Sequence, residues 1–164
     1  PENGLSLSSQ YFTTKNGQLW KHYNNDSRNM FYGIHYNSEL SVVLNDSPST
    51  VKNFKTINYE GDTGWSVESM TTDSDNGSPI PAYVSTSASA ENTWQDLMIA
   101  GFKKKDNKYY SYIVNETLPK TNEILFGGDI SGVKGFFNKV QLSVSDTSAK
   151  ELFAVSSEYE LLTN

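Results

Sequence analysis

The chain has no cysteine, which excludes a disulfide scaffold, a thiolate zinc site and a cysteine nucleophile. Arginine is almost as scarce, because Arg28 stands alone beside twelve lysines. Bidentate recognition of phosphates and guanine bases favours arginine, and the net charge of −6 repels polyanions. Together these shortages argue against a nucleic-acid-binding protein and against binding to an anionic membrane.

Long hydrophobic runs are also missing. No stretch approaches the roughly 20 apolar residues that span a bilayer, so we predict no membrane insertion. The segment Pro1 to Gly4 does not resemble a signal peptide, and it lacks the Met of a natural start. We therefore expect residues 1–164 to form a single β domain that is a segment, or a small relative, of a larger protein.

Aromatic residues, in contrast, make up 13% of the chain. They suit half-buried pleated surfaces and therefore favour sheet over helix bundles. Short alternating segments are separated by turn signals, with little helical periodicity. The pattern predicts an all-β fold, either an antiparallel β-sandwich or a small barrel, with short hairpins and at most one or two short helices. One such helix is expected at Ala90 to Met98, after a long loop that begins at Asp73.

Turn residues predict a first hairpin within Gln10 to Tyr23. Asn16-Gly17 is a preferred pair for a two-residue type I′ turn, which requires positive φ at both positions. Counting outwards from this turn places Thr13 opposite Trp20 on one face. The register of the hairpin follows from its turn alone.

A second hairpin is predicted around Asp106-Asn107. Its register puts lysine stems across from aromatic rings, with Lys103 opposite Tyr110 and Lys104 opposite Tyr109. Further strands are expected from alternation or aromatic content at residues 39–44, 65–70, 136–144 and 152–159.

No convincing catalytic or metal-binding motif is present. His22, opposite Tyr11, and His35 lack a carboxylate at zinc-site spacing, so both are expected to be structural. The segment Asp73 to Gly77 resembles the start of a calcium loop, but its glycine comes one residue early and the twelfth position is Val84. A G-x-S-x-G elbow and a G-K-[ST] phosphate loop are both absent. We predict no enzyme and no cofactor or metal.

Two arrangements do suggest binding. Trp20, Trp65 and Trp94 lie with several tyrosines among amide and acidic residues, a mixture that stacks on sugar rings, although such aromatics more often fill a core or a subunit contact. The lysine-rich hairpin could dock an acidic surface on an identical or adjacent subunit, or it could be a solvated tip. The candidate interface residues are Lys103, Lys104, Lys105, Tyr109, Tyr110, Trp20 and Trp94.

Several long strings carry a family resemblance: GLSLSSQYFTTKNGQLWKH (residues 4–22), RNMFYG (28–33), SELSVVLNDSPSTVKNFKTINYEG (38–61) and ELFAVSSEYE (151–160). In this order they resemble large virion structural proteins of tailed bacteriophages, of the marine myovirus and cyanophage type. The resemblance covers most of the chain and brings no catalytic motif. It also implies a corner after Leu44, made of a Pro-containing turn, a short helical link and another strand, with Lys52 exposed.

The resemblance implies a non-catalytic structural component of the tail, baseplate or fibre, located in the virion and assembled in the bacterial host cytoplasm. Its expected partners are other virion proteins and further copies of itself in a symmetric assembly. The alternative is a receptor- or glycan-binding module on the phage particle, with a possible host-surface glycan as ligand. A depolymerase-like enzyme is a third and weaker alternative.

Overall fold

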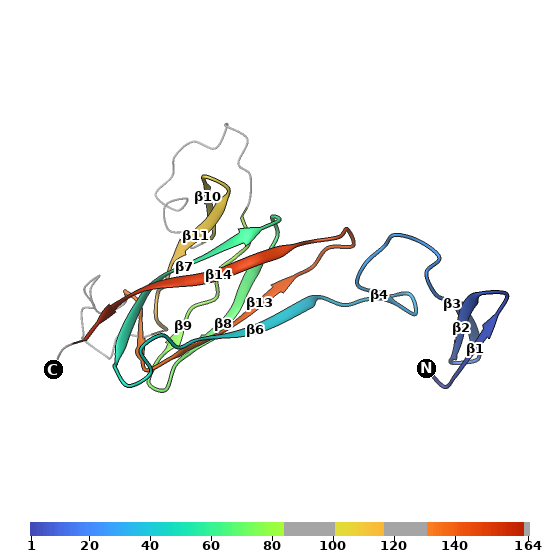
Figure 1. Cartoon of the computed structure of the whole chain (residues 1–164), viewed down its shortest axis with the longest axis horizontal. Coiled ribbons are helices and arrows are strands. Elements are labelled where there is room, and N and C mark those ends of the chain that lie inside the picture. Colours follow the sequence, from blue (N-terminus) through green and yellow to red (C-terminus); the bar gives the residue numbers. More distant parts are fainter. Residues whose placement is uncertain (84–100, 117–130, 163–164) are drawn as a thin grey trace, which may run out of the picture. The chain divides into compact units, whose positions relative to one another are not determined.

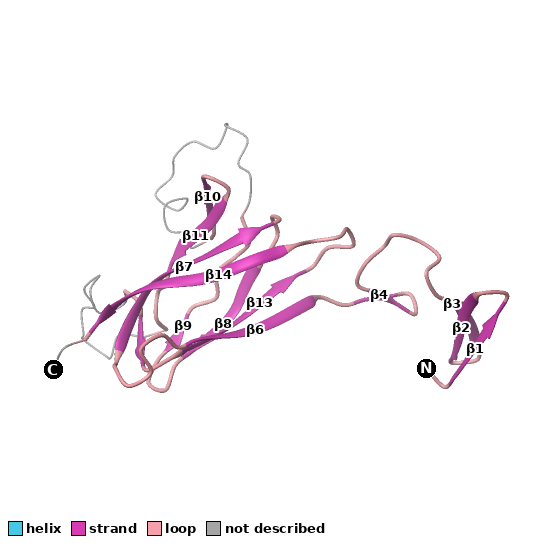
Figure 2. Ribbon diagram, in the orientation of Figure 1, coloured by secondary structure: helices cyan, strands magenta, loops and turns pink. Residues whose placement is uncertain are grey.

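The computed structural model describes residues 1–83, 101–116 and 131–162, in which every regular element is a β-strand (Figures 1 and 2). The strands form several antiparallel sheets, and none of these sheets closes into a barrel. The predicted all-β fold is therefore confirmed, with the sandwich rather than the barrel as its form. The helix expected at Ala90 to Met98 lies outside the described residues.

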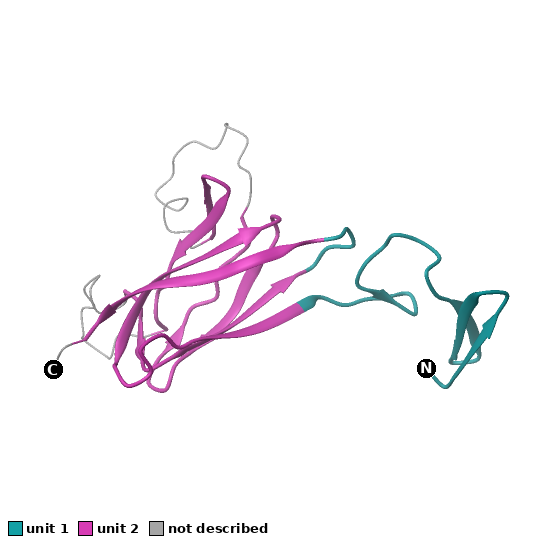
Figure 3. Ribbon diagram, in the orientation of Figure 1, with its two compact units in different colours: residues 1–38, 145–149 teal, residues 39–144, 150–164 magenta. Residues whose placement is uncertain are grey.

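The chain divides into two compact units (Figure 3). The amino-terminal unit comprises residues 1–38 and 145–149, and the carboxyl-terminal unit comprises residues 39–144 and 150–164. Because two compact units can belong to one domain, the single domain expected from the sequence stays a prediction.

The amino-terminal unit is built from short hairpins. A three-stranded sheet contains β1 (Asn3–Leu7), β2 (Gln10–Lys15) and β3 (Gln18–Lys21), and a small ladder joins β4 (Met30–Phe31) to β5 (Ile34–His35). Asn16 and Gly17 have φ values of 54° and 71°, as a type I′ turn requires. Thr13 pairs with Trp20, so the register predicted for this hairpin is confirmed.

The carboxyl-terminal unit packs two sheets face to face (Figure 1). The first sheet is built around β7 (Lys52–Gly61), which pairs with β14 (Leu152–Leu161) along one side. Its other side pairs with β11 (Lys108–Tyr112) and β12 (Val133–Gly135), and β10 (Lys103–Lys105) pairs with β11. The second sheet has the order β6 (Ser38–Leu44), β13 (Asn138–Val144), β8 (Ser66–Thr71) and β9 (Asn76–Gly77).

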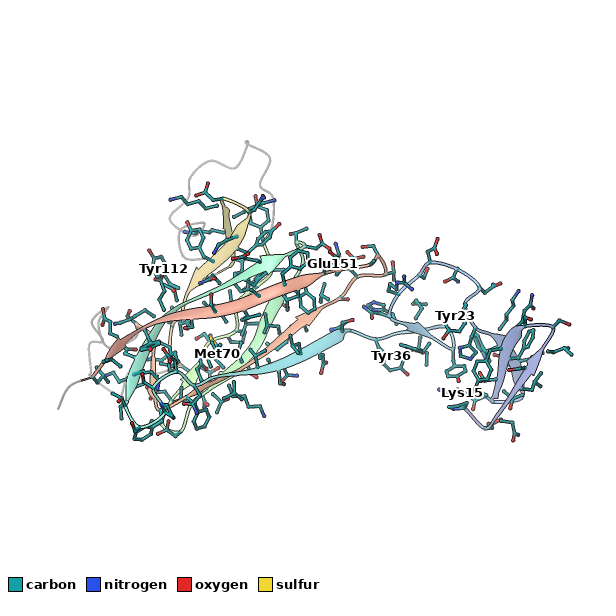
Figure 4. All side chains as sticks on the ribbon, viewed as in Figure 1. Lys15, Tyr23, Tyr36, Met70, Tyr112 and Glu151 are labelled. Carbon is teal, nitrogen blue, oxygen red and sulfur yellow. The ribbon has the colours of Figure 1, made fainter. Side chains whose placement is uncertain are left out.

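Both sheets contribute side chains to one core. Met70, labelled in Figure 4, belongs to it and is 1% exposed. The alternation predicted for residues 136–144 holds from Asn138 onwards, because Asn138, Val140, Leu142 and Val144 are all buried. The buried hydrophobic residues are Phe54, Ile57, Tyr59, Trp65, Val67, Met70, Ile80, Phe102, Tyr109, Ile113, Val133, Val140, Leu142 and Val144.

Two β-bulges place residues three apart in sequence on the same buried face. In β7, Thr56 pairs with Glu158 and Phe54 with Tyr159, so Lys55 is the extra residue. This insertion turns both Phe54 and Ile57 towards the core, although plain alternation would place them on opposite faces. An equivalent bulge in β8 allows Val67 and Met70 to be buried together.

The corner after Leu44 differs from the expectation in two ways. A turn leads directly into β7, which is one continuous strand of ten residues without a helical link. Partners on both sides of β7 provide a full ladder of hydrogen bonds, and this pairing outweighs the local turn chemistry. Lys52 is fully buried, not exposed, because its ammonium group donates to the carbonyls of Ser47 and Thr50.

Candidate functional site

The predicted lysine hairpin forms one edge of the first sheet. Asp106 and Asn107 have φ values of 50° and 63°, consistent with a tight turn at its tip. Lys103 pairs with Tyr110 and Lys104 with Tyr109, so the predicted register is confirmed. All three residues of β10 are exposed lysines. A short edge strand of lysines discourages backbone pairing with another chain, so contacts here must be made by side chains.

The inner face of this hairpin belongs to the core. Tyr109 is 4% exposed and stacks on Tyr59, with ring centroids 4.7 Å apart. Burial and the neighbouring Tyr109 raise the pKa of the Tyr59 phenol far above its ordinary value. Lys104 lies over the same ring, with Nζ 5.4 Å from the centroid of Tyr109. Of the predicted interface residues, Tyr109 and Lys104 therefore have a packing role.

The outer face of the hairpin carries the groups that are free to meet a partner. Because side chains alternate along a strand, Lys103 and Lys105 share this face with Tyr110 and Tyr112. Tyr112 is 67% exposed and is labelled in Figure 4. Among the described residues, Lys103 and Lys105 take part in no ion pair, whereas Lys108 is bound to Glu60 at 2.7 Å.

Charge changes sign across the outer face of the sheet. Tyr112 on β11 pairs with Thr56 on β7, which pairs in turn with Glu158 on β14. The far strand, β14, carries Glu158 and Glu160 as its charged residues and has no basic residue. Glu160 already forms an ion pair with Lys55 at 3.6 Å, whereas Glu158 takes part in no ion pair among the described residues. Its only strand partner among the described residues is β7. The same sheet thus presents a basic edge at β10 and an acidic edge at β14.

A bulge also exposes a large apolar side chain near the start of β14. Leu152 pairs with Gly61 and Ala154 with Glu60, which leaves Phe153 as the extra residue. Its side chain is 73% exposed. Bulges commonly redirect a side chain in this way, and an exposed phenylalanine beside the acidic edge adds apolar contact area.

The two tryptophans within the described residues differ in their burial. Trp65 is 7% exposed and belongs to the core of the carboxyl-terminal unit, while Trp94 lies outside the described residues. Trp20 is half-buried in the amino-terminal unit. The residues singled out from the sequence are therefore divided between core and surface roles.

A pocket of about 390 Å³ lies within the amino-terminal unit. Trp20 forms part of its wall, and the ring of Tyr32 meets the indole edge-on at 5.6 Å. The lining residues are Trp20, Lys21, His22, Tyr23, Asn24, Asn25, Ser27, Arg28, Asn29, Met30, Phe31, Tyr32 and Gly33. Sequence reasoning missed this pocket, although the lone arginine close to Tyr23-Asn24-Asn25 was a usable signal.

A buried threonine links two residues of the pocket lining, His22 and Tyr32. Thr13 is 2% exposed, and its hydroxyl is hydrogen-bonded to Nε2 of His22 at 2.8 Å and to the hydroxyl of Tyr32 at 3.1 Å. Lys15 places Nζ 4.6 Å from the centroid of the Tyr32 ring. The ring of His22 also lies 5.1 Å from that of Tyr11, its expected neighbour across the hairpin, and the purely structural role expected for His22 stays a prediction.

The carboxylates of the calcium-like segment are bound to the backbone. Asp73 accepts a hydrogen bond from the N–H of Phe136, which holds the pKa of this carboxyl below its ordinary value. Asp75 accepts one from the N–H of Lys134 at 2.8 Å. Within residues 1–83, 101–116 and 131–162, no cluster of metal-ligating side chains is found. In the same ranges, no helix is long and apolar enough to cross a membrane.

The chain was compared with known protein families. Residues 26–116, more than half of the chain, match the family model described as the Crassvirus muzzle protein C-terminal domain. No curated protein matches the chain.

Proposed function

The chain belongs to the crassvirus muzzle protein C-terminal domain family, and on this premise we propose that it assembles with copies of itself through opposite edges of one sheet. Membership identifies it as a structural protein of a bacteriophage particle. We propose that its role there is non-enzymatic and depends on contacts with other virion proteins. Location in the tail, baseplate or fibre, assembly in the host cytoplasm and the marine myovirus and cyanophage resemblance remain predictions.

The observation that carries the assembly proposal is the separation of charge across the first sheet. Lys103 and Lys105 lie at one edge, and Glu158 and Glu160 lie at the other. The occupant that fits each edge is therefore the opposite edge of a second copy. Complementary charges of this kind steer encounters and fix which surfaces meet.

The contact is head-to-tail, because it joins two different surfaces of the same chain. A heterologous contact generates a ring when its rotation closes, which suits a symmetric virion component. Tyr112 and Phe153, which are 67% and 73% exposed, provide apolar area at the two sides of the sheet. The charges guide docking, and the aromatic residues contribute the desolvated contacts.

Charge reversal at each edge tests this arrangement. The basic-edge variant carries Lys103→Glu and Lys105→Glu, and the acidic-edge variant carries Glu158→Lys and Glu160→Lys. Association of the full chain is measured by sedimentation over a concentration series at low and high salt. Each variant alone should lose association, and an equimolar mixture should regain it, because each then presents the edge that the other needs.

The matched control is Lys139→Glu, which reverses an exposed lysine on β13 in the other sheet. Wild-type association should weaken with added salt, since charges are screened over about 8 Å at physiological ionic strength. A wild-type chain that does not associate, or single variants that associate as strongly as the control, would overturn the proposal. The hairpin would then be a solvated tip.

The second candidate function is recognition of a receptor or a glycan. The pocket of the amino-terminal unit favours it, because this pocket combines aromatic, amide and cationic side chains.

A further inference from the structure

We propose that the pocket of the amino-terminal unit binds an acidic carbohydrate, namely a sugar residue that carries a carboxylate, such as a uronic or sialic acid. This site is separate from the assembly edges and does not depend on them. Its volume of about 390 Å³ falls within the usual range for small-ligand pockets, roughly 300 to 1,000 Å³.

The first support is Tyr23, labelled in Figure 4, whose side chain is 96% exposed. Its φ of 55° lies in the left-handed region, which is unfavourable for a residue with a side chain. Tyr32 has the same φ, but its ring packs against Trp20 at 5.6 Å and so compensates for this backbone conformation. Tyr23 has no comparable burial. Residues held in such strained backbone conformations cluster at functional sites, including those that hold ligands.

The second support is the charge of the lining. Lys21 and Arg28 line the pocket, and no aspartate or glutamate does, although the whole chain has a net charge of −6. Arg28 is the only arginine in the chain, and its backbone N–H donates to the carbonyl of Thr147 at 2.7 Å. Among the described residues, its guanidinium takes part in no salt bridge. A guanidinium group matches the two oxygens of a carboxylate in a bidentate contact.

The third support is the supply of groups for hydroxyl recognition. Asn24, Asn25 and Ser27 line the pocket and are exposed, although Oδ1 of Asn25 already accepts from the backbone N–H of Ser27 at 3.0 Å and leaves its amide NH₂ for a ligand. Asn29 is excluded from this set, because it already donates to the carbonyl of Asp146 and accepts from Ser38. Amide and hydroxyl groups beside an aromatic ring suit a polyhydroxylated ring compound.

An acidic peptide from another virion protein is the competing ligand, since it would also satisfy Arg28. Peptides are usually bound by a sheet edge or an extended apolar groove. The pocket instead offers the exposed rings of Tyr23 and Phe31, several amides and two cationic side chains within one short loop. This combination favours a sugar.

The test is titration of the full chain with glucuronic acid and with N-acetylneuraminic acid. Binding is monitored through the NMR chemical shifts of the backbone amides. Glucose is the neutral control, and a tetraglutamate peptide represents the competing ligand. The acidic sugars should shift amides of residues 20–33 and bind more tightly than glucose. Tyr23→Ala and Arg28→Gln should each weaken binding by about tenfold or more, as expected for the loss of one dominant contact.

Arg28→Gln should also remove the preference for acidic over neutral sugar, which a purely structural role of Arg28 would leave unchanged. Tyr112→Ala is the matched control, because it removes an exposed tyrosine that does not line the pocket. Asn24→Ala serves as a second pocket variant if Tyr23→Ala fails to fold. Equal binding of glucose and the acidic sugars, binding of tetraglutamate alone, or shifts outside residues 20–33 would overturn the proposal.

Discussion

Replacing Lys52 by methionine removes a buried ammonium group and keeps most of the side-chain stem. The Nζ atom donates to the carbonyls of Ser47 and Thr50, each at 3.0 Å. It also lies 5.9 Å from the ring centroids of both Phe54 and Tyr159. The side chain therefore joins the turn before β7 to the aromatic residues that cover the end of the core.

The expected magnitude follows from two opposing terms. Two hydrogen bonds from a charged donor contribute about 3 to 6 kcal/mol in sum. Removing a buried charge recovers several kcal/mol of desolvation free energy. We expect the Lys52→Met variant to lose about 1 to 3 kcal/mol of unfolding free energy, because the two carbonyls are left without their donor.

Urea unfolding of the full chain, followed by circular dichroism, measures this loss. The control is Lys139→Met, which makes the same substitution at an exposed position on β13 and should stay within about 0.5 kcal/mol of wild type. The dependence of free energy on urea should have the same slope in all three proteins. Equal stability of the two variants would refute the reasoning, since Lys52 would then contribute nothing through its buried contacts.

Two further predictions concern stability. Gly61→Ala should lower the unfolding free energy by about 2 kcal/mol or more, because an added Cβ would lie 2.9 Å from Cα of Leu152 at a φ of +153°. Thermal unfolding should show a smaller loss for Gly17→Ala, where the added Cβ meets nothing within 4 Å. Equal losses in the two variants would contradict this account. Hydrogen bonds from Ser143 and Ser66 lower the pKa of Glu68 from its ordinary value of 4.5, so its contribution to stability should be present above that value and disappear as the pH falls through the lower folded value. Urea midpoints measured from about pH 6 to pH 3 should decline less steeply for Glu68→Gln, and parallel curves would count against the assignment.

The sequence by itself was sufficient where the deciding interactions are local. Asn16, Asp106 and Asn107 tolerate positive φ because of their short polar side chains, and Gly17 does so because it lacks a Cβ. Both hairpins and their registers could therefore be derived by counting from the turn. The all-β class followed in the same way from aromatic content and alternation.

Tertiary structure decided the features that depend on a partner strand. Phe54 and Ile57 share the core only because a bulge at Lys55 shifts the register against β14, about a hundred residues later in the chain. Alternation along one strand contains no information on such a shift. The helical link expected from the resemblance was wrong because β7 has partner strands on both sides. The exposed Lys52 was wrong because its ammonium group is bound by the carbonyls of Ser47 and Thr50.

The candidate sites likewise depend partly on local sequence and partly on pairing between distant strands. The cluster of Lys103 to Lys105 was visible in the sequence, because its residues are adjacent. Its counterpart at Glu158 was not, since β7 is what places β11 and β14 in one sheet. The amino-terminal pocket likewise depends on contacts of Thr13 with His22 and Tyr32, whose positions are set by two separate hairpins. Local conformational preference determined the turns and the fold class, whereas pairing between distant strands determined which charges and aromatic rings face a partner.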